Sequence, residues 1–146
     1  MRPFLIIATV AVSALVFAQG VRSSSPRAPV AVTARISDYG RILFDGRGFA
    51  LYAFTRDRAG RSACSGSCAK AWPPFIVTRR LHADGGARGS LLGTTHRRDG
   101  QLQATYAGKP LYFYVGDRKP GQVLCQNVRE FGGLWLVVRP SGALVR

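Results

Sequence analysis

Acidic residues are scarce in this chain. Seven Asp and Glu stand against 21 Lys and Arg among 146 residues, which gives a formal net charge of +14. Such a surface attracts anionic matter, including acidic lipids, wall polymers and nucleic acid, and charge alone does not choose among them. Charged residues of both signs make up 19% of the chain and hydrophobic residues 47%, which argues against long disorder and for one globular domain.

The motifs of common enzymes are also missing. No GxSxG, SxxK or Walker-type segment occurs, so nucleophilic catalysis and nucleotide binding have no sequence support. His82 and His96 form neither an HxxxH nor an HExxH spacing, and CxxCH for haem attachment is absent. Whether the protein is an enzyme stays open, and a non-enzymatic role is favoured.

The N-terminal residues are typical of an export signal. Arg2 precedes a mostly apolar stretch from Phe4 to Phe17, and small residues follow, so we predict a signal peptide over 1–20. This stretch is shorter than the ~20 apolar residues that a membrane-spanning helix needs, and an uncleaved anchor is the alternative. No cysteine stands near the predicted cleavage site to carry a lipid. We expect a secreted or envelope-associated protein.

An internal duplication follows a short linker. The Ser, Pro and Ala-rich segment 21–34 is predicted to be extended, so the folded domain is expected over 35–146. Within it, LYAFTRD at 51–57 recurs as LYFYVGD at 111–117, and each copy later reaches a Trp before an apolar run. The predicted parts are copy one at 36–78, a connector at 79–100 and copy two at 101–146.

Each copy of the motif is predicted to be a strand that ends in a tight turn. The two-residue period of a strand places the aromatic positions on one face, with Leu51 and Ala53 on the other face in copy one. Aspartate at the first turn position is expected to accept a backbone N–H two residues on. The motif positions are Tyr52, Phe54 and Asp57 in copy one and Tyr112, Tyr114 and Asp117 in copy two.

The expected fold class is mainly β: a single small domain of two duplicated antiparallel β units. A short helix is predicted after the CxxxC segment, capped by Ser67 and ended by Pro73 and Pro74. The connector is Gly-rich and polar, which predicts a surface connection with a short hairpin. Further strands are predicted at 41–44, 75–78, 101–106 and 134–139.

Together these features resemble a bacterial secreted-repeat family of predicted lipoproteins with a conserved Yx(F/W/Y)xxD motif. Two aromatic-Asp motifs, a CxxxC followed by WPP, and GGxW before an apolar strand carry the resemblance, which covers roughly Ile36 to Leu144. The resemblance implies an extracytoplasmic, duplicated domain. It implies no catalytic residues, because the family has no established activity.

Three cysteines, Cys64, Cys68 and Cys125, lie in the predicted domain, and an oxidising compartment permits disulfides. Cys64 and Cys125 stand at similar places in the two copies and could meet across a pseudo-symmetric core. Closing about 60 residues stabilises by roughly 4 kcal/mol, against about 2 kcal/mol for the five-residue CSGSC loop. This favours a bond to Cys125, while Gly66 keeps a local Cys64–Cys68 bond open.

The alternative function uses the same three cysteines. Converging thiolates of Cys64, Cys68 and Cys125 suit copper or zinc, and a redox-active dithiol is a related possibility. The favoured interpretation needs no cofactor.

Aromatic and charged residues complete the functional hypotheses. The aromatic residues could stack on sugars or bases, but core packing is the better supported interpretation. Catalysis by Asp57 and Asp117 would require the two carboxylates to converge in a cleft, and turn capping explains them without it. We predict an exported, non-enzymatic binding or structural module that contacts anionic envelope polymers or the membrane surface, with nucleic acid disfavoured. Arginines 79, 80, 88, 97 and 98, in and around the connector, are the candidate contact residues.

Overall fold

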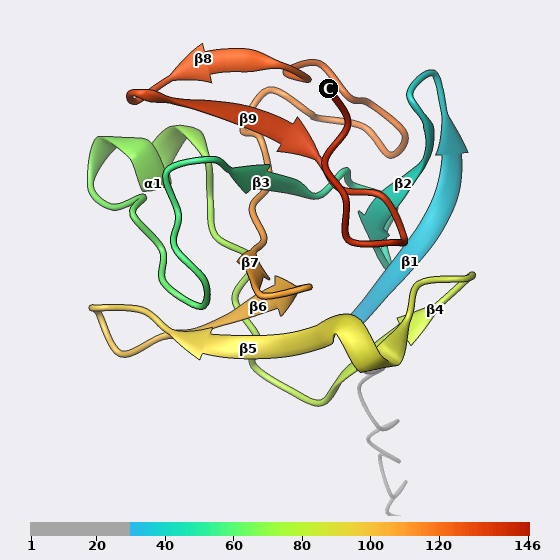
Figure 1. Ribbon diagram of the computed structural model, residues 1–146, viewed down its shortest axis with the longest axis horizontal. Helices are drawn as coiled ribbons and strands as arrows, with labels where there is room; N and C mark the ends of the chain where they lie inside the picture. The colour runs from blue at the N-terminus through green and yellow to red at the C-terminus, as the bar shows by residue number, and fades with distance from the viewer. Residues whose placement is uncertain (1–29) are drawn as a thin grey trace, which may run out of the picture.

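Two β-hairpins sixty residues apart form the framework (Figure 1). The computed structural model describes residues 30–146, and the predicted signal peptide lies outside them. In copy one, β1 (Val30–Ser37) pairs antiparallel with β2 (Gly40–Asp45). In copy two, β5 (Leu92–His96) pairs antiparallel with β6 (Leu102–Tyr106).

The remaining elements are short. Three three-stranded sheets form, with the orders β2-β1-β4, β3-β9-β8 and β5-β6-β7, and of the strand pairs in them only β1 with β4 is parallel. The mainly β fold with one short α-helix is confirmed for the described residues. The other elements are β3 (Tyr52–Phe54), α1 (Ser67–Ala71), β4 (Leu81–Asp84), the 3₁₀ turn η1 (Gly89–Leu91), β7 (Lys109–Pro110), β8 (Val128–Glu130) and β9 (Gly133–Val137).

The two copies exchange their closing segments. Strand β9 of copy two pairs with β3 of copy one, and the Leu43 N–H on β2 donates to the Val138 carbonyl at 2.8 Å. In the reverse direction, the Ala104 N–H on β6 donates to the Phe75 carbonyl of copy one at 2.9 Å. Each copy therefore completes the sheet of the other.

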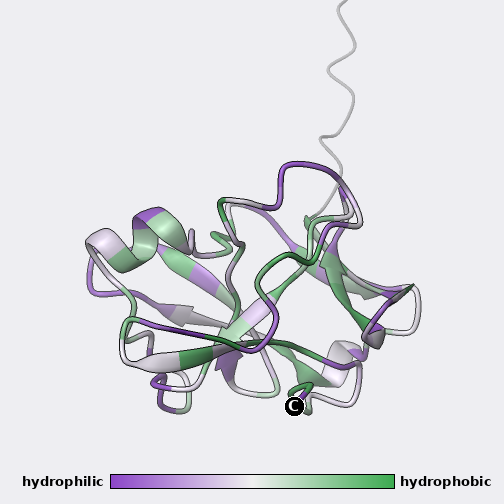
Figure 2. Ribbon diagram, turned by 90° about the horizontal axis from the view of Figure 1, so that it is seen from above, coloured by the Kyte–Doolittle hydropathy of each residue, from purple (hydrophilic) through white to green (hydrophobic). Residues whose placement is uncertain are grey.

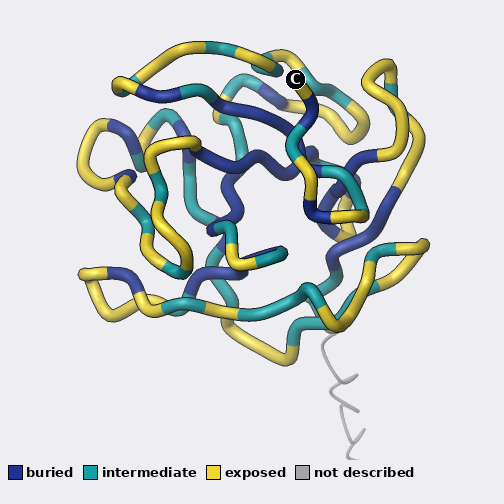
Figure 3. Tube along the Cα trace, viewed as in Figure 1, coloured by how far each residue is buried: buried dark blue, intermediate teal, exposed yellow. Residues whose placement is uncertain are grey.

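The motif segments separate two apolar clusters, as the two-residue period predicts. The predicted strand forms in copy one as β3, whereas copy two has isolated bridges at Tyr112 and no regular strand over residues 111–117. Tyr52 and Phe54 belong to one cluster, and Leu51 and Ala53 belong to the other. Buried backbone lies at the centre of the molecule and exposed backbone follows the outer loops, where hydrophilic residues are frequent (Figures 2 and 3). The motifs thus lie at the centre of the fold.

Two predicted boundaries were wrong. The linker was expected to reach residue 34, but β1 begins at Val30, and the Val32 side chain is fully buried. The connector was expected to be a surface connection that contains a short hairpin, yet its strands pair outside it: β4 pairs with β1, and β5 pairs with β6 of copy two. The loop-like composition of these segments predicted no strands. The strands form through backbone hydrogen bonds to their neighbours, and composition does not indicate such bonds.

Two local predictions also need correction. Segment 75–78 is extended but forms no regular strand, because its backbone bonds alternate between neighbours: the Phe75 N–H donates to Leu111, and the Val77 N–H donates to Leu102. Helix α1 is not capped by Ser67. Its N-cap is Gly66 with φ 56°, and no side chain caps this end of the helix.

Candidate functional site

The two motifs are joined by a reciprocal exchange of hydrogen bonds. The Tyr52 hydroxyl of copy one donates to Asp117 Oδ2 of copy two at 2.7 Å, and the Tyr112 hydroxyl donates to Asp57 Oδ2 at 2.7 Å. The backbones of the two tyrosines also pair, since each N–H donates to the other carbonyl at 2.9 Å. A pseudo-twofold axis therefore passes between Tyr52 and Tyr112.

Each aspartate uses its second oxygen to hold its own loop. Asp57 Oδ1 accepts the Ala63 N–H at 2.7 Å, and Asp117 Oδ1 accepts the Leu124 N–H at 2.9 Å. Each aspartate was predicted to accept the backbone N–H two residues further along the chain. Instead it accepts an N–H six residues further on in copy one and seven in copy two, because the loop folds back over the carboxylate. The carboxylates are engaged separately on opposite sides of the axis, so the geometry offers no paired catalytic carboxylates.

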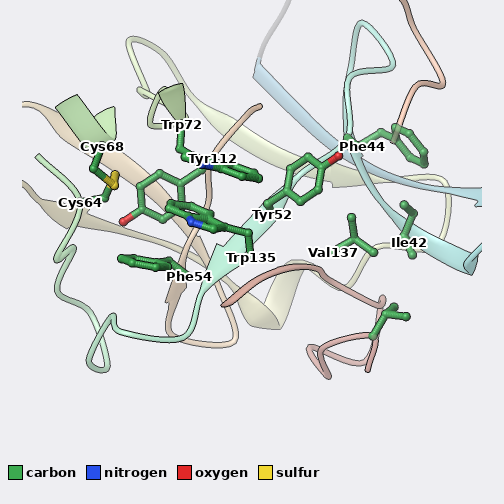
Figure 4. Packing of buried hydrophobic residues seen from close by; sticks show 12 residues of the cluster. Ile42, Phe44, Tyr52, Phe54, Cys64, Cys68, Trp72, Tyr112, Trp135 and Val137 are labelled. Atoms are coloured by element: carbon green, nitrogen blue, oxygen red, sulfur yellow. A yellow bond between two sulfur atoms is a disulfide. The ribbon is translucent and has the colours of Figure 1, made fainter. Parts of the chain in front are cut away.

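The remaining aromatic motif residues, Phe54 and Tyr114, form a column of four rings across the axis together with two tryptophans. Trp72 stacks on Trp135 with ring centroids 4.0 Å apart (Figure 4). Phe54 of copy one stacks on Trp135 at 4.2 Å, and Tyr114 of copy two lies against Trp72 at 4.8 Å. Both tryptophans are 0% exposed. Core packing, not a surface stacking platform, is the role that this geometry gives them.

Exchange between the copies predicts a specific energetic coupling. In a double-mutant cycle measured by urea unfolding, Tyr52→Phe and Asp117→Asn should couple by about 1–2 kcal/mol, because each removes the same hydrogen bond to a buried carboxylate. Tyr52→Phe and Asp57→Asn change two ends of one motif and should be additive within ~0.5 kcal/mol. A larger coupling energy between Tyr52→Phe and Asp57→Asn than between Tyr52→Phe and Asp117→Asn would contradict the exchange.

The half-buried Asp57 carboxyl predicts a pH dependence of stability. Burial raises its pKa from 3.8 to about 6, although hydrogen bonds from Ala63 and Tyr112 and the charge of Arg97 oppose the rise. A raised pKa means that the folded state binds the proton more tightly than the unfolded state does. The resulting stabilisation is full below the unfolded pKa and is lost as the pH rises through the folded pKa.

Urea unfolding at a series of pH values measures this contribution. From about pH 4 to about pH 7, the free energy of unfolding should fall less in Asp57→Asn than in the wild type, because the variant lacks the titrating carboxyl. The control Asp38→Asn changes an exposed turn residue and should keep the wild-type profile. Identical profiles for Asp57→Asn and the wild type would remove Asp57 as the cause.

The structure joins Cys64 to Cys68, with the Cα atoms 5.3 Å apart. The bond from Cys64 to Cys125 that loop entropy favoured is therefore wrong. Equivalent residues of the two copies contact each other only near the pseudo-twofold axis. Cys64 and Cys125 lie in the loops that follow the two motifs, away from this axis. Gly66, with its positive φ, allows the tight CSGSC turn that brings Cys64 to Cys68.

Cys125 remains a free, half-buried thiol. Burial raises the pKa of this thiol, and a hydrogen bond with the Tyr114 hydroxyl partly opposes the rise. A raised pKa leaves little thiolate, the form that binds metal and attacks disulfides. Within residues 30–146, no group of three or more His, Cys, Asp or Glu side chains is placed to hold a metal ion. With Cys64 and Cys68 joined, this structure brings together no three-thiolate site.

Thiol chemistry tests this pairing. The folded protein should titrate one free thiol, and the reduced, denatured protein should titrate three. Replacing Cys64 and Cys68 with serine should lower the free energy of unfolding by about 2 kcal/mol, the value for a five-residue loop. The control Cys125→Ser should show no free thiol when folded. A disulfide-linked peptide that contains Cys125, found after proteolysis of the unreduced protein, would contradict the pairing.

Two adjoining hollows beside the disulfide form what we call the arginine groove. They measure about 470 and 430 Å³ and share a wall made of Arg56, Ser62, Ala63 and Arg98. Asp99 is the one acidic residue among the described residues that line them. Arg58 and Arg61 line only the second hollow, whereas Cys64, Ser65, Gly66, Ala69, Arg97 and Asp99 line only the first.

Arg97 fixes the inner wall of the groove. Its guanidinium is 9% exposed and donates to the Cys64 carbonyl at 2.8 Å, to Gln103 Oε1 at 2.7 Å and to Ser62 Oγ at 3.0 Å. Asp99 Oδ2 lies 3.5 Å from Arg97 Nε. Because a buried guanidinium is held by several acceptors, the disulfide loop and β6 are tied together at this point.

The sequence predicted only some of the arginines that line this groove. Of the predicted arginine cluster, Arg97 and Arg98 line it, while arginines 79, 80 and 88 do not. Arg56, Arg58 and Arg61 were missed because they flank the Asp57 motif, where turn formation explained the segment. The density of arginine in TRDRAGR was the available signal.

A larger hollow of about 820 Å³ lies on another face, lined in part by Phe75, Phe113, Arg47 and His82. His82 is half-buried here, and its Nδ1 has no hydrogen-bond partner, whereas His96 is exposed as expected. The Arg47 guanidinium pairs with Asp45 at 2.7 Å and lies over the Phe113 ring. This hollow therefore offers fewer uncommitted cationic groups than the arginine groove.

The exchanged motifs, the short strands and the disulfide define a duplicated β domain of the secreted type. The chain belongs to the family described as a secreted repeat of unknown function, whose model matches residues 33–76 and 93–139. The two matches begin sixty residues apart, in β1 and β5, which confirms the duplication. No curated protein and no solved structure matches the chain. Across residues 30–146, no helix has the length and apolar character needed to cross a membrane.

Proposed function

We propose that this exported protein is a non-enzymatic module that binds phosphate-bearing anionic material of the cell envelope in the arginine groove. The observation that carries the proposal is the set of exposed arginines around one disulfide-held loop. Arg58, Arg61 and Arg98 are exposed, and their side chains have no ion pair or hydrogen bond with other described residues. They present uncompensated positive charge to a ligand.

The turn that carries two of these arginines supports the proposal. Arg58 and Arg61 face each other across an antiparallel bridge, with backbone hydrogen bonds of 3.2 and 2.8 Å. The intervening Gly60 donates its N–H to Gly108 of copy two, which anchors the turn. Like charges directly opposite each other are destabilising, so a bound anion would relieve a repulsion already present in the fold.

Few acidic residues are available to neutralise the groove: among the described residues Asp99 is the one carboxylate in its lining, and it lies 3.5 Å from Arg97. Asp57 and Asp117 are committed to the exchange at the axis, and Glu130 accepts the Trp72 indole N–H at 2.7 Å. Asp45 accepts the backbone N–H groups of residues 47 and 49. Most of the few carboxylates therefore stabilise the fold, and the arginine surface keeps its charge.

A catalytic alternative has less support at this site. The Ser62 hydroxyl lies 2.7 Å from the Tyr112 hydroxyl, whose single proton is given to Asp57, and its Oγ accepts a hydrogen bond from Arg97. Burial raises the pKa of the Tyr112 hydroxyl, so it stays protonated and donates instead of removing a proton. Without a base, the serine is not activated as a nucleophile.

Binding to two anionic probes tests the proposal. The wild-type protein should bind long-chain polyphosphate and vesicles that contain phosphatidylglycerol, with affinity falling as salt rises. The variant Arg58→Gln/Arg61→Gln/Arg98→Gln should lose most of the binding to at least one probe. Polyphosphate binding alone would indicate a polymer ligand, and vesicle binding alone would indicate a membrane surface.

A charge-matched control separates the groove from net charge. Arg80→Gln/Arg118→Gln/Arg129→Gln removes the same three charges from exposed positions outside the groove. It should bind nearly as well as the wild type. Equal losses in the two triple variants would reject the groove as the binding site, and no salt-dependent binding to either probe would reject the function.

A further inference from the structure

We infer that the ligand of the arginine groove is a single linear polyanion without bases, a phosphodiester-linked chain of polyols or sugars, that spans both hollows at once. This inference rests on the proposed function and deepens it by naming the ligand class. It is carried by the shape of the groove, by its lining and by the rigidity of its walls.

The dimensions of the groove favour a chain over a small ion. Hollows of about 300–1,000 Å³ hold drug-sized molecules, and each of these two hollows falls within that range. One inorganic anion would leave either hollow largely empty. Because Arg56 and Arg98 line both hollows, a strand that leaves one hollow enters the other without crossing an uncharged wall.

The lining argues against nucleic acid. Proteins that bind single strands stack bases on aromatic side chains, and no aromatic residue is among the described residues that line the groove. Trp72 and Trp135, at the centre of the fold, are fully buried and committed to each other. A polymer that offers phosphates without bases therefore suits the exposed arginines of the groove, Arg58, Arg61 and Arg98.

The same lining argues against insertion into a membrane. The large hydrophobic side chains that are exposed in the described chain lie elsewhere, at Ile36, Tyr39, Val115 and Leu124. A protein that docks on a bilayer buries apolar side chains alongside its basic ones. The groove is concave and lined by five arginines, which suits an anionic strand lying within it.

Its chemistry suits phosphate in particular. All five cationic residues of the groove are arginines, although the chain also contains lysines. The planar guanidinium donates two parallel hydrogen bonds to phosphate oxygens, which a lysine ammonium cannot do. The disulfide between Cys64 and Cys68 and the bonds of Arg97 hold the inner hollow in shape, so little conformational freedom is lost on binding.

Chain length is the variable that tests the inference. Calorimetric titrations of the full folded domain with orthophosphate, tripolyphosphate and long-chain polyphosphate should show an affinity gain on the order of 100-fold from the shortest to the longest probe, because occupation of one hollow raises the effective concentration at the other. Single-stranded DNA and polyglutamate of equal charge should bind more weakly than long-chain polyphosphate.

Two double variants test whether the second hollow contributes to binding of the long chain. Arg58→Gln/Arg61→Gln changes residues that line only this hollow and should reduce the ratio of long-chain to orthophosphate affinity towards one. The charge-matched Arg118→Gln/Arg129→Gln should leave the ratio unchanged. A ratio near one in the wild type, tighter binding of DNA, or the same ratio in all three proteins would overturn the inference. In each of these cases groove-dependent anion binding could persist, whereas its complete absence would reject the proposed function.

Discussion

Two hydrogen bonds from buried tyrosines to the motif aspartates, buried Asp117 and half-buried Asp57, hold this fold in register. Each joins the strand of one copy to the loop of the other, as Tyr52 does with Asp117, so neither motif is complete by itself. The stacked tryptophans and the exchanged closing strands require the same alignment. The YxFxxD pattern is thus explained by the contact between the copies, and it leaves chemistry to residues outside the pattern.

The acidic residues explain how a stable core and a strongly basic surface coexist. A carboxylate that accepts hydrogen bonds inside a fold can stabilise it without neutralising a surface cation. Asp57 and Asp117 lie at the axis, and Glu130 holds a buried tryptophan. Because so few acids exist, their structural use leaves Asp99 as the one acidic residue among the described residues that line the arginine groove, against five arginines. The scarcity of acid and the charge of the groove are therefore one property of the sequence.

The sequence predicted the duplication, the β class and the faces of the motif strands, because each follows from a local period. It could not predict the exchange, since a period tells which residues share a face but not which copy they contact. Loop entropy misjudged Cys125 because that model counts residues and ignores the symmetry that keeps equivalent cysteines apart. The groove combines arginines from 56–61 with Arg97 and Arg98, and only the tertiary fold brings these segments together.

Most arginines of the groove have no basic counterpart in the other copy, although Arg58 corresponds to Arg118. Sixty positions away, the counterparts of Arg56 and Arg61 are Gly116 and Gly121, and the counterparts of Arg97 and Arg98 are Ser37 and Asp38. The residues at the axis are alike in the two copies because both must fit the same contact. The surface residues face no such constraint, so basic charge can gather on one side of the pseudo-twofold axis. A pseudo-symmetric core and a basic groove on one side fit a division in which the repeats supply the architecture, while the loop of the first repeat and the β5–β6 turn of the second together supply the binding surface.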